Sequence, residues 1–272
     1  MLDGWKYSNY GLISIVPPHK DAQLNLIDNW KTKGVGGVRP LYIQYTSDFD
    51  CGQETEWWYC IKDDIFDLSE LKSKRRYEIN KGLKNFEARR ITPLDYISEI
   101  NEIRDKLFAQ YPEEYRIKNN PSNVINSYRN RTGEWISIGA FQDGKLRGYL
   151  DAEVKDGYID FTRLCVDPEY EKQGINFVLV FMLLSECKSF IERGFYICDG
   201  ARTIRHKTSF QDWLEKYFGF RKAYCKLNID CKSFIGVLIS IIRPLTVHSD
   251  NIHNSKLYNL VCFAKLYYIA KG

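Results

Sequence analysis

The stretch CVDPEYEKQGINFVLVFMLL, residues 165 to 184, decides how this chain can be interpreted. It begins as the end of a strand, passes through Asp167-Pro168 into a polar loop, and reaches a single glycine, Gly174. The apolar run that follows predicts a helix over residues 175–193 that is buried nearly all round. A helix N-terminus presents unpaired N–H groups and the positive end of the helix dipole, and glycine lets a ligand approach the backbone. The turn is therefore predicted to bind a phosphate group, the alternative being a plain strand-to-helix turn.

The residues before this turn predict an antiparallel meander. Asp143-Gly144 and Asp156-Gly157 separate three β-like runs, and Asp-Gly is a strong hairpin signal. The three predicted strands cover residues 134–141, 145–154 and 158–166.

The residues after the turn predict a parallel strand pair. Residues 195–198 read as a short buried strand, and a strand, a crossover helix and a second strand form a right-handed unit. The other predicted elements of this region are helices over residues 95–110, 121–128 and 209–217 and a strand over 221–229.

The first ninety residues predict an α+β unit of their own, with strands over 41–46 and 55–61 and helices over 21–31 and 68–86. Ile91-Thr92-Pro93 is typical of an exit from such a unit. The expected domains are residues 1–91, residues 92–229 and a helical tail over residues 230–272.

Composition limits the class of protein. With 44% hydrophobic residues the chain can bury a core, and its net charge of +4 does not by itself predict a nucleic-acid partner. The eight cysteines include no C-x-x-C pair, and His248 and His253 are five residues apart with only Asp250 as an acidic residue between them, so neither disulfides nor a metal site is expected. The N-terminal residues have no signal-peptide pattern, and a cytoplasmic location is expected.

The order of elements over residues 92–229 resembles the GCN5-related N-acetyltransferase (GNAT) fold, an α/β fold with a mixed sheet. In that family a loop V-x-P-x-Y-(R/Q)-x-x-G-x-(G/A) binds the pyrophosphate of acyl-CoA, and residues 166–176 are similar to it. Phe218-Gly219-Phe220 is similar to a late Gly-Phe pair of the family. Two positions depart from the pattern, since Glu171 replaces Arg or Gln and Asn176 replaces Gly or Ala.

The resemblance implies an acyl-CoA-dependent acyltransferase, most simply an acetyltransferase that uses acetyl-CoA and needs no metal. It implies that main-chain N–H groups of the turn bind the pyrophosphate, and that an N–H of the preceding strand, from Cys165 or Val166, stabilises the oxyanion. The residues expected to contact acyl-CoA are Cys165, Val166, Glu171, Lys172, Gln173, Gly174, Ile175 and Asn176.

Two aspartates are candidate general bases. Asp160 lies on the strand before the loop, where strict alternation would place it on the same face as Thr162 and Leu164. Asp199 ends the parallel strand, at the edge where open α/β sheets place ligand-binding groups. Each aspartate also has a non-catalytic alternative: Asp160 as an exposed strand residue and Asp199 as a helix cap.

Two further side chains are candidates for proton transfer. His206 follows the parallel strand and titrates near neutrality, although a surface loop explains it equally. The family often has a Tyr that protonates the leaving thiolate, in the helix before the Gly-Phe pair. Glu215 stands four residues before Gly219, and Tyr217, two residues before it, is the remaining candidate or else a core residue.

The segment DLSELKSKRRYEINKGLK, residues 67–84, resembles the Arg-rich helix of FemAB-like transferases, which carry a degenerate acetyltransferase-like half before the intact one. The resemblance implies that residues 1–91 are such a half. Residues 71–90 hold eight basic residues against two acidic ones, either as a solvated face or as a contact for an anionic acceptor. Arg75, which falls in the apolar file of the helix, and Trp58 are candidate acceptor-binding residues.

Three functions stay open. The first is an acyltransferase that transfers acetyl directly from acetyl-CoA to an amino or hydroxyl group of a small or glycan-precursor acceptor. The second is a FemAB-like transferase that takes an aminoacyl group from tRNA, and the third is a non-catalytic binding protein with the same fold. The tail is expected to pack as one or two helices, the alternative being a peripheral membrane anchor.

Overall fold

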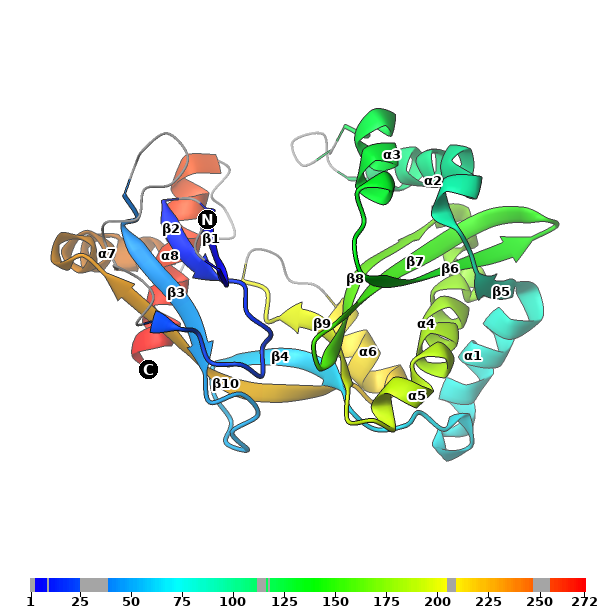
Figure 1. Ribbon diagram of the computed structural model, residues 1–272, viewed down its shortest axis with the longest axis horizontal. Helices are drawn as coiled ribbons and strands as arrows, with labels where there is room; N and C mark the ends of the chain where they lie inside the picture. The colour runs from blue at the N-terminus through cyan, green and yellow to red at the C-terminus, as the bar shows by residue number, and fades with distance from the viewer. Residues whose placement is uncertain are drawn as a thin grey trace. The chain divides into compact units, whose positions relative to one another are not determined.

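The computed structural model describes residues 3–8, 10–24, 39–111, 116, 118–204, 209–246 and 255–272 (Figure 1). The chain forms two compact units that are each discontinuous in sequence. The first contains Met1–Cys60, Ala201–Ser209 and Arg221–Gly272, and the second contains Ile61–Gly200 and Phe210–Phe220. These divisions differ from the predicted boundaries after residues 91 and 229, because long-range packing places neighbouring segments in different units.

Five strands lie side by side in the second unit, in the order β9-β8-β7-β6-β5 (Figure 1). Their bounds are β5 (Glu87–Arg90), β6 (Glu134–Gln142), β7 (Lys145–Lys155), β8 (Tyr158–Val166) and β9 (Tyr196–Ala201). Neighbours from β5 to β8 pair antiparallel, whereas β8 and β9 pair parallel. The predicted meander and the predicted parallel pair are confirmed.

Helices cover both faces of this sheet, with α2 and α3 on one face and α1 and α4 on the other (Figure 1). Their bounds are α1 (Ser73–Asn85), α2 (Ile97–Ala109), α3 (Pro121–Arg129), α4 (Ile175–Glu186), α5 (Lys188–Ile191) and α6 (Phe210–Phe218), with short 3-10 turns η3 (Leu68–Glu70), η4 (Pro93–Tyr96) and η6 (Pro168–Gln173). Six of the twelve residues of α4 are buried, in keeping with its lack of a polar face, but the single helix predicted over residues 175–193 is divided into α4 and α5. Helix α1 packs mainly against α4, which explains why it lies in the second unit.

A bulge interrupts the pairing of β7 with β8. Asp151 pairs with Arg163, but the next residue of β7, Ala152, pairs with Phe161, so β8 holds one extra residue, Thr162. A bulge breaks the strict alternation of side chains along a strand. The prediction that Asp160 shares a face with Thr162 and Leu164 by regular alternation is therefore wrong.

In the first unit, four strands lie in the order β1-β2-β3-β10, with bounds Trp5–Ser8, Gly11–Ser14, Tyr42–Ser47 and Arg221–Cys231. β2 pairs parallel with β3, and the other neighbours pair antiparallel. Strand β4 (Trp57–Lys62) contains the chain position at which the two units divide. The predicted strands over 41–46, 55–61 and 221–229 are confirmed, β1 and β2 were not predicted, and the predicted helix over 21–31 lies largely outside the described residues.

The tail forms two helices, α7 (Ser233–Thr246) and α8 (Ser255–Lys271), as the sequence predicts. Ile235 and Ile239 of α7 pack with Ala264 of α8 in one apolar cluster. Within the described ranges, no helix is both long enough and apolar enough to cross a membrane.

A buried ionic cluster ties the sheet of the second unit to one of its helices. Asp151 of β7 has no exposed surface. Its carboxylate accepts hydrogen bonds from Ser137 Oγ at 2.6 Å and Tyr128 Oη at 3.1 Å, and it forms ion pairs with Arg131 at 2.8 Å and Arg163 at 3.2 Å. Because these partners come from β6, α3, the loop after α3 and β8, one carboxylate holds four segments in register.

We expect Asp151→Ala to lower the free energy of unfolding by about 3–5 kcal/mol, because it leaves two arginine side chains without their buried counter-charge. Urea unfolding measures the change. Glu102→Ala, which removes an exposed partner of Lys106, serves as the control and should cost about 0–1 kcal/mol. Equal losses for the two variants would contradict the structural role given to Asp151.

Candidate active site

Strands β8 and β9 pair over only three residues and then part. The pairing runs from Tyr158 opposite Tyr196 to Asp160 opposite Cys198. Beyond it a pocket of about 270 Å³ opens, lined by residues of β8, by the end of β9 and by the start of α6. The lining residues are Phe161, Thr162, Arg163, Leu164, Asp199 and Phe210.

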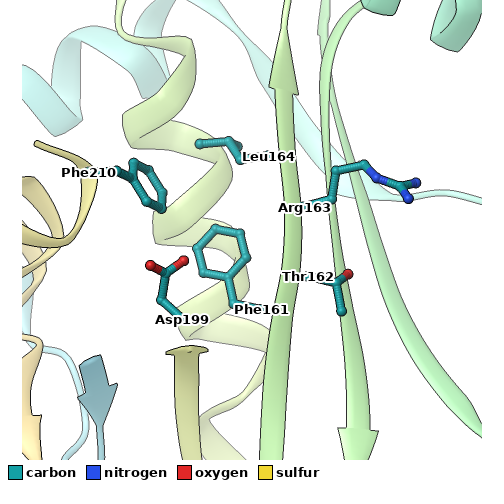
Figure 2. Close-up of a pocket in the computed structure, with 6 residues that line it drawn as sticks. All are labelled: Phe161, Thr162, Arg163, Leu164, Asp199 and Phe210. Atoms are coloured by element: carbon teal, nitrogen blue, oxygen red, sulfur yellow. The ribbon is translucent and has the colours of Figure 1, made fainter. Parts of the chain in front are cut away.

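The pocket combines apolar walls with one carboxylate. Figure 2 shows the side chains of Phe161, Leu164 and Phe210 on the same side of β8 as Asp199, while Thr162 and Arg163 point to the other side. The rings of Phe161 and Phe210 meet edge to face, with centroids 5.9 Å apart. Asp199 is thus held among apolar groups, which poorly replace the water that solvates a free carboxylate.

This surrounding shifts the proton affinity of the carboxylate. Burial raises the pKa of Asp199 from its ordinary value of 3.8 to about 7, opposed by a hydrogen bond from Gln211 and reinforced by the negative charge of Asp160. A group whose pKa lies near the working pH exchanges protons most effectively as a general base. Asp199, one of the four predicted proton-transfer residues, thus lines the pocket and has a pKa near neutrality.

The hydrogen-bond ladder shows which main-chain groups of β8 face the gap. The N–H of Asp167 donates to the carbonyl of Arg147 at 2.8 Å, which places that pair among the hydrogen-bonded positions of β7 and β8. Antiparallel strands alternate hydrogen-bonded and non-hydrogen-bonded pairs, so the main chain of Cys165 faces β7. The N–H groups of Leu164 and Val166 face the other edge, where β9 no longer pairs. The ladder favours Val166 over Cys165 as an oxyanion donor and adds Leu164.

The turn before α4 is shaped by a contact between two glycines. Gly174 has a φ of +91°, and a β carbon there would lie 2.9 Å from the backbone nitrogen of Gly82 in α1. A β carbon on Gly82 would in turn overlap the carbonyl oxygen of Gly174. Both positions need glycine, because backbone meets backbone at the crossing of α1 with the turn.

Helix α1 also binds the turn through side chains. Lys81 Nζ donates to the carbonyl of Lys172 at 2.6 Å, and Asn85 Nδ2 donates to the carbonyl of Gln173 at 3.0 Å. Both bonds use carbonyl oxygens of the turn and leave the N–H groups of the turn free for other acceptors. The predicted Arg-rich helix therefore holds the turn through its carbonyl groups.

At the start of α4, two main-chain N–H groups remain available as hydrogen-bond donors. Gly174 N–H donates to the carbonyl of Glu171 at 3.2 Å, while Gly174 O accepts bonds from Phe177 and from Val178. In the described part of the chain, the N–H groups of Ile175 and Asn176 have no acceptor. Two free donors at the positive end of a buried helix are suited to an anion.

Arg147 was not predicted from the sequence. Its guanidinium lies 4.7 Å from the ring centroid of Tyr170, a residue of the turn, and its Nε is buried with no hydrogen-bond partner among the described residues. A buried donor without a partner is unusual in proteins and is often explained by a bound group. In the sequence Arg147 is one basic residue in a strand, and only the fold brings it to the turn.

The other predicted proton-transfer groups lie in different settings. Asp160 forms an ion pair with Lys155 at 2.9 Å, and the carboxylate of Asp160 helps to raise the pKa of Lys155. The ring of Tyr217 packs edge to face on Phe177, 4.9 Å between centroids, in an aromatic cluster with Trp213. His206 lies outside the described residues.

The two predicted acceptor-binding residues lie in different units. Arg75 is half-buried on α1 of the second unit, and its guanidinium forms no ion pair within the ranges the structure describes. Trp58 belongs to the first unit, where Arg202 and Lys222 each lie 4.7 Å from a ring centroid. Acceptor binding by either stays a prediction.

Most of the cysteine side chains are buried. All eight cysteines are free thiols, and only Cys51 is fully exposed. Over the described ranges, no group of three or more His, Cys, Asp or Glu side chains is arranged to hold a metal ion.

Comparison with known proteins finds one family. Residues 100–220, a little under half of the chain, match the model of the acetyltransferase (GNAT) family. The predicted resemblance and the predicted mixed α/β fold are confirmed, and the family match supports the predicted acyltransferase class. No curated protein matches the sequence.

Similar solved structures include acetyltransferases and the proteins L-PGS and FemX. The ribosomal-protein-S18-alanine N-acetyltransferase of Escherichia coli is 15% identical over 39% of this chain and 61% of its own, with a TM-score of 0.31. L-PGS from Bacillus licheniformis is 14% identical over 74% of this chain and 66% of its own, with a TM-score of 0.48. FemX is 9% identical over 61% of this chain and 59% of its own, with a TM-score of 0.48. The chain thus spans less than two thirds of each protein.

The raised pKa of Asp199 predicts a pH-dependent cost to stability. Between pH 3.8 and about 7 the folded state holds a proton that the unfolded state has lost, so stability falls as pH rises through this window. Asp199→Asn removes the ionisation and should raise the free energy of unfolding by roughly 1–3 kcal/mol near pH 8, with a much smaller gain near pH 5. The figure is below the full conversion of the pKa shift because the carboxyl is partly exposed.

Urea unfolding at the two pH values tests this prediction, with Asp105→Asn as the matched control. Asp105 is exposed on α2 and does not act on Asp199, so its neutralisation should give no gain at either pH. A gain for Asp199→Asn that is equal near pH 5 and pH 8 would show that its pKa is not raised.

Proposed function

We propose that the protein transfers an acyl group from acyl-CoA, most simply acetyl from acetyl-CoA, to an amino or hydroxyl group of a small or glycan-precursor acceptor. One observation carries the proposal. Where β8 and β9 part, the N–H groups of Leu164 and Val166 face the same gap as Asp199, whose pKa lies near 7. A thioester carbonyl needs hydrogen-bond donors at its oxygen, and the attacking group needs a nearby base.

The turn supports binding of the pyrophosphate of the donor. The N–H groups of Ile175 and Asn176 offer two donors at the positive end of α4, and Arg147 offers a guanidinium beside the turn. The side chain of Glu171 is exposed, so its charge is screened by water rather than held inside the turn. The residues present therefore fit a phosphate group.

In the proposed reaction the amino nitrogen or hydroxyl oxygen of the acceptor forms a bond to the acyl carbon, and Asp199 accepts the proton that this atom loses. The bond from the acyl carbon to sulfur breaks, and the thiolate leaves with the electron pair and takes up a proton. The N–H groups of Leu164 and Val166 donate to the carbonyl oxygen, where negative charge develops. Tyr217 and His206 stay candidates for the proton donor to sulfur.

Aminoacyl transfer from tRNA is the second candidate function. The observation that favours it is α1, whose basic side chains include Arg75 and which contacts the turn directly through Lys81. In this alternative the basic helix would bind phosphates of the tRNA. A non-catalytic protein is the third candidate, supported by Glu171 and Glu215 at positions where the family pattern has other residues.

Thermal unfolding with CoA separates these functions. A saturating concentration of CoA should raise the melting temperature of the wild-type chain, because a ligand that binds only the folded state stabilises it. Asn176→Glu should abolish the shift, because it places a negative charge in the first turn of α4, next to the proposed pyrophosphate. Glu169→Gln, an exposed change in the same turn, serves as the control and should keep the shift.

Activity then separates binding from chemistry. Asp199→Asn should keep the CoA shift and lose about 10²–10⁴-fold in transfer rate, the usual contribution of a general base. No stabilisation by CoA, together with retention of tRNA on a native gel, would favour the aminoacyl transferase. Failure of both ligands would favour a non-catalytic protein.

A further inference from the structure

Helix α7 of the first unit has an apolar face that nothing in the described structure covers. Four large apolar side chains of this helix are exposed: Phe234 by 53%, Val237 by 63%, Leu238 by 53% and Ile241 by 68%. Their spacing of three and four residues places them on one stripe, within an arc of about 100° around the helix axis. Contiguous exposed apolar residues of this kind mark interaction surfaces.

The stripe is separate from the face that holds α7 to the rest of the unit. Ile235 and Ile239, 9% and 1% exposed, pack with Ala264 and with aromatic residues of α8. One face thus anchors the helix, and the exposed stripe makes no contribution to that packing. An apolar stripe that the core does not use predicts a second partner.

The charge of the tail sequence indicates what that partner is. Residues 231–272 contain five basic residues and one acidic residue, a net charge of +4, which equals the net charge of the whole chain. The excess positive charge of the protein is therefore concentrated in the two tail helices and their connection. The residues are Lys232, Arg243, Lys256, Lys265, Lys271 and Asp250.

We propose that α7 docks on an anionic phospholipid bilayer, with its apolar stripe in the interface and the basic residues of the tail close to the headgroups. An interfacial helix combines apolar residues on one side with Lys and Arg near the lipid charges, and both terms add to the binding free energy. The 14 residues of α7 are fewer than the roughly 20 that span a bilayer, so the helix lies along the surface.

Vesicle flotation with the full chain tests the proposal. The wild-type protein should float with phosphatidylcholine vesicles that contain about one third phosphatidylglycerol, and much less with phosphatidylcholine alone, because anionic lipid attracts the basic tail. High salt should weaken the binding, since it screens this attraction. Ile241→Glu should lower the partition coefficient about tenfold or more, because it replaces an inserted aliphatic side chain by a charge.

Ile15→Glu is the matched control. Ile15 lies in the same unit, is 58% exposed and is not part of α7, so its replacement should leave flotation unchanged. Circular dichroism checks that both variants keep their helices, and the CoA-dependent melting shift is not expected to change in either.

Three results would overturn the proposal. The wild-type chain would fail to float with anionic vesicles, or it would float equally well with neutral ones. The third is a wild-type dimer in sedimentation that Ile241→Glu dissociates without any vesicle binding, which would make a second copy of the chain the occupant of the stripe.

Discussion

The parting of β8 from β9 is the constraint on which the site depends. Three residue pairs join the two strands, and beyond them the facing edges of β8 and β9 are no longer paired with each other. Buried main-chain groups need hydrogen bonds, so the N–H groups of Leu164 and Val166 are available to a ligand only because the pairing stops there. The same gap exposes Asp199 to a small molecule while Phe161 and Phe210 keep water scarce, which accounts for its raised pKa.

The turn before α4 is held by a residue far away in sequence. Gly82 of α1 meets Gly174 backbone to backbone, and α1 also binds two carbonyl groups of the turn. The proposed binding of phosphate at this turn needs fixed N–H groups, since ordering a mobile turn on binding would cost free energy. The basic helix that resembles one in FemAB-like transferases therefore has a positioning role in this chain, whichever of the proposed donors binds.

Much of the fold follows from local sequence, and the site only in part. Two Asp-Gly turns and the apolar run after Gly174 predict the meander, the buried helix and the parallel strand, because these signals are local. The bulge at Thr162 depends on the pairing register, which alternation along one strand cannot reveal. Contacts such as Gly82 with Gly174 join residues that only the fold brings together, and β1 and β2 are four-residue strands with weak periodicity.

The most direct test follows single N–H groups during a titration with CoA. In an isotope-labelled chain, amide resonances of Leu164, Val166, Ile175 and Asn176 should shift together and saturate at one CoA concentration. That result is predicted because these donors face the gap and the start of α4, where the thioester and the pyrophosphate would bind. Shifts confined to other parts of the chain, or no saturable shift at all, would contradict the account.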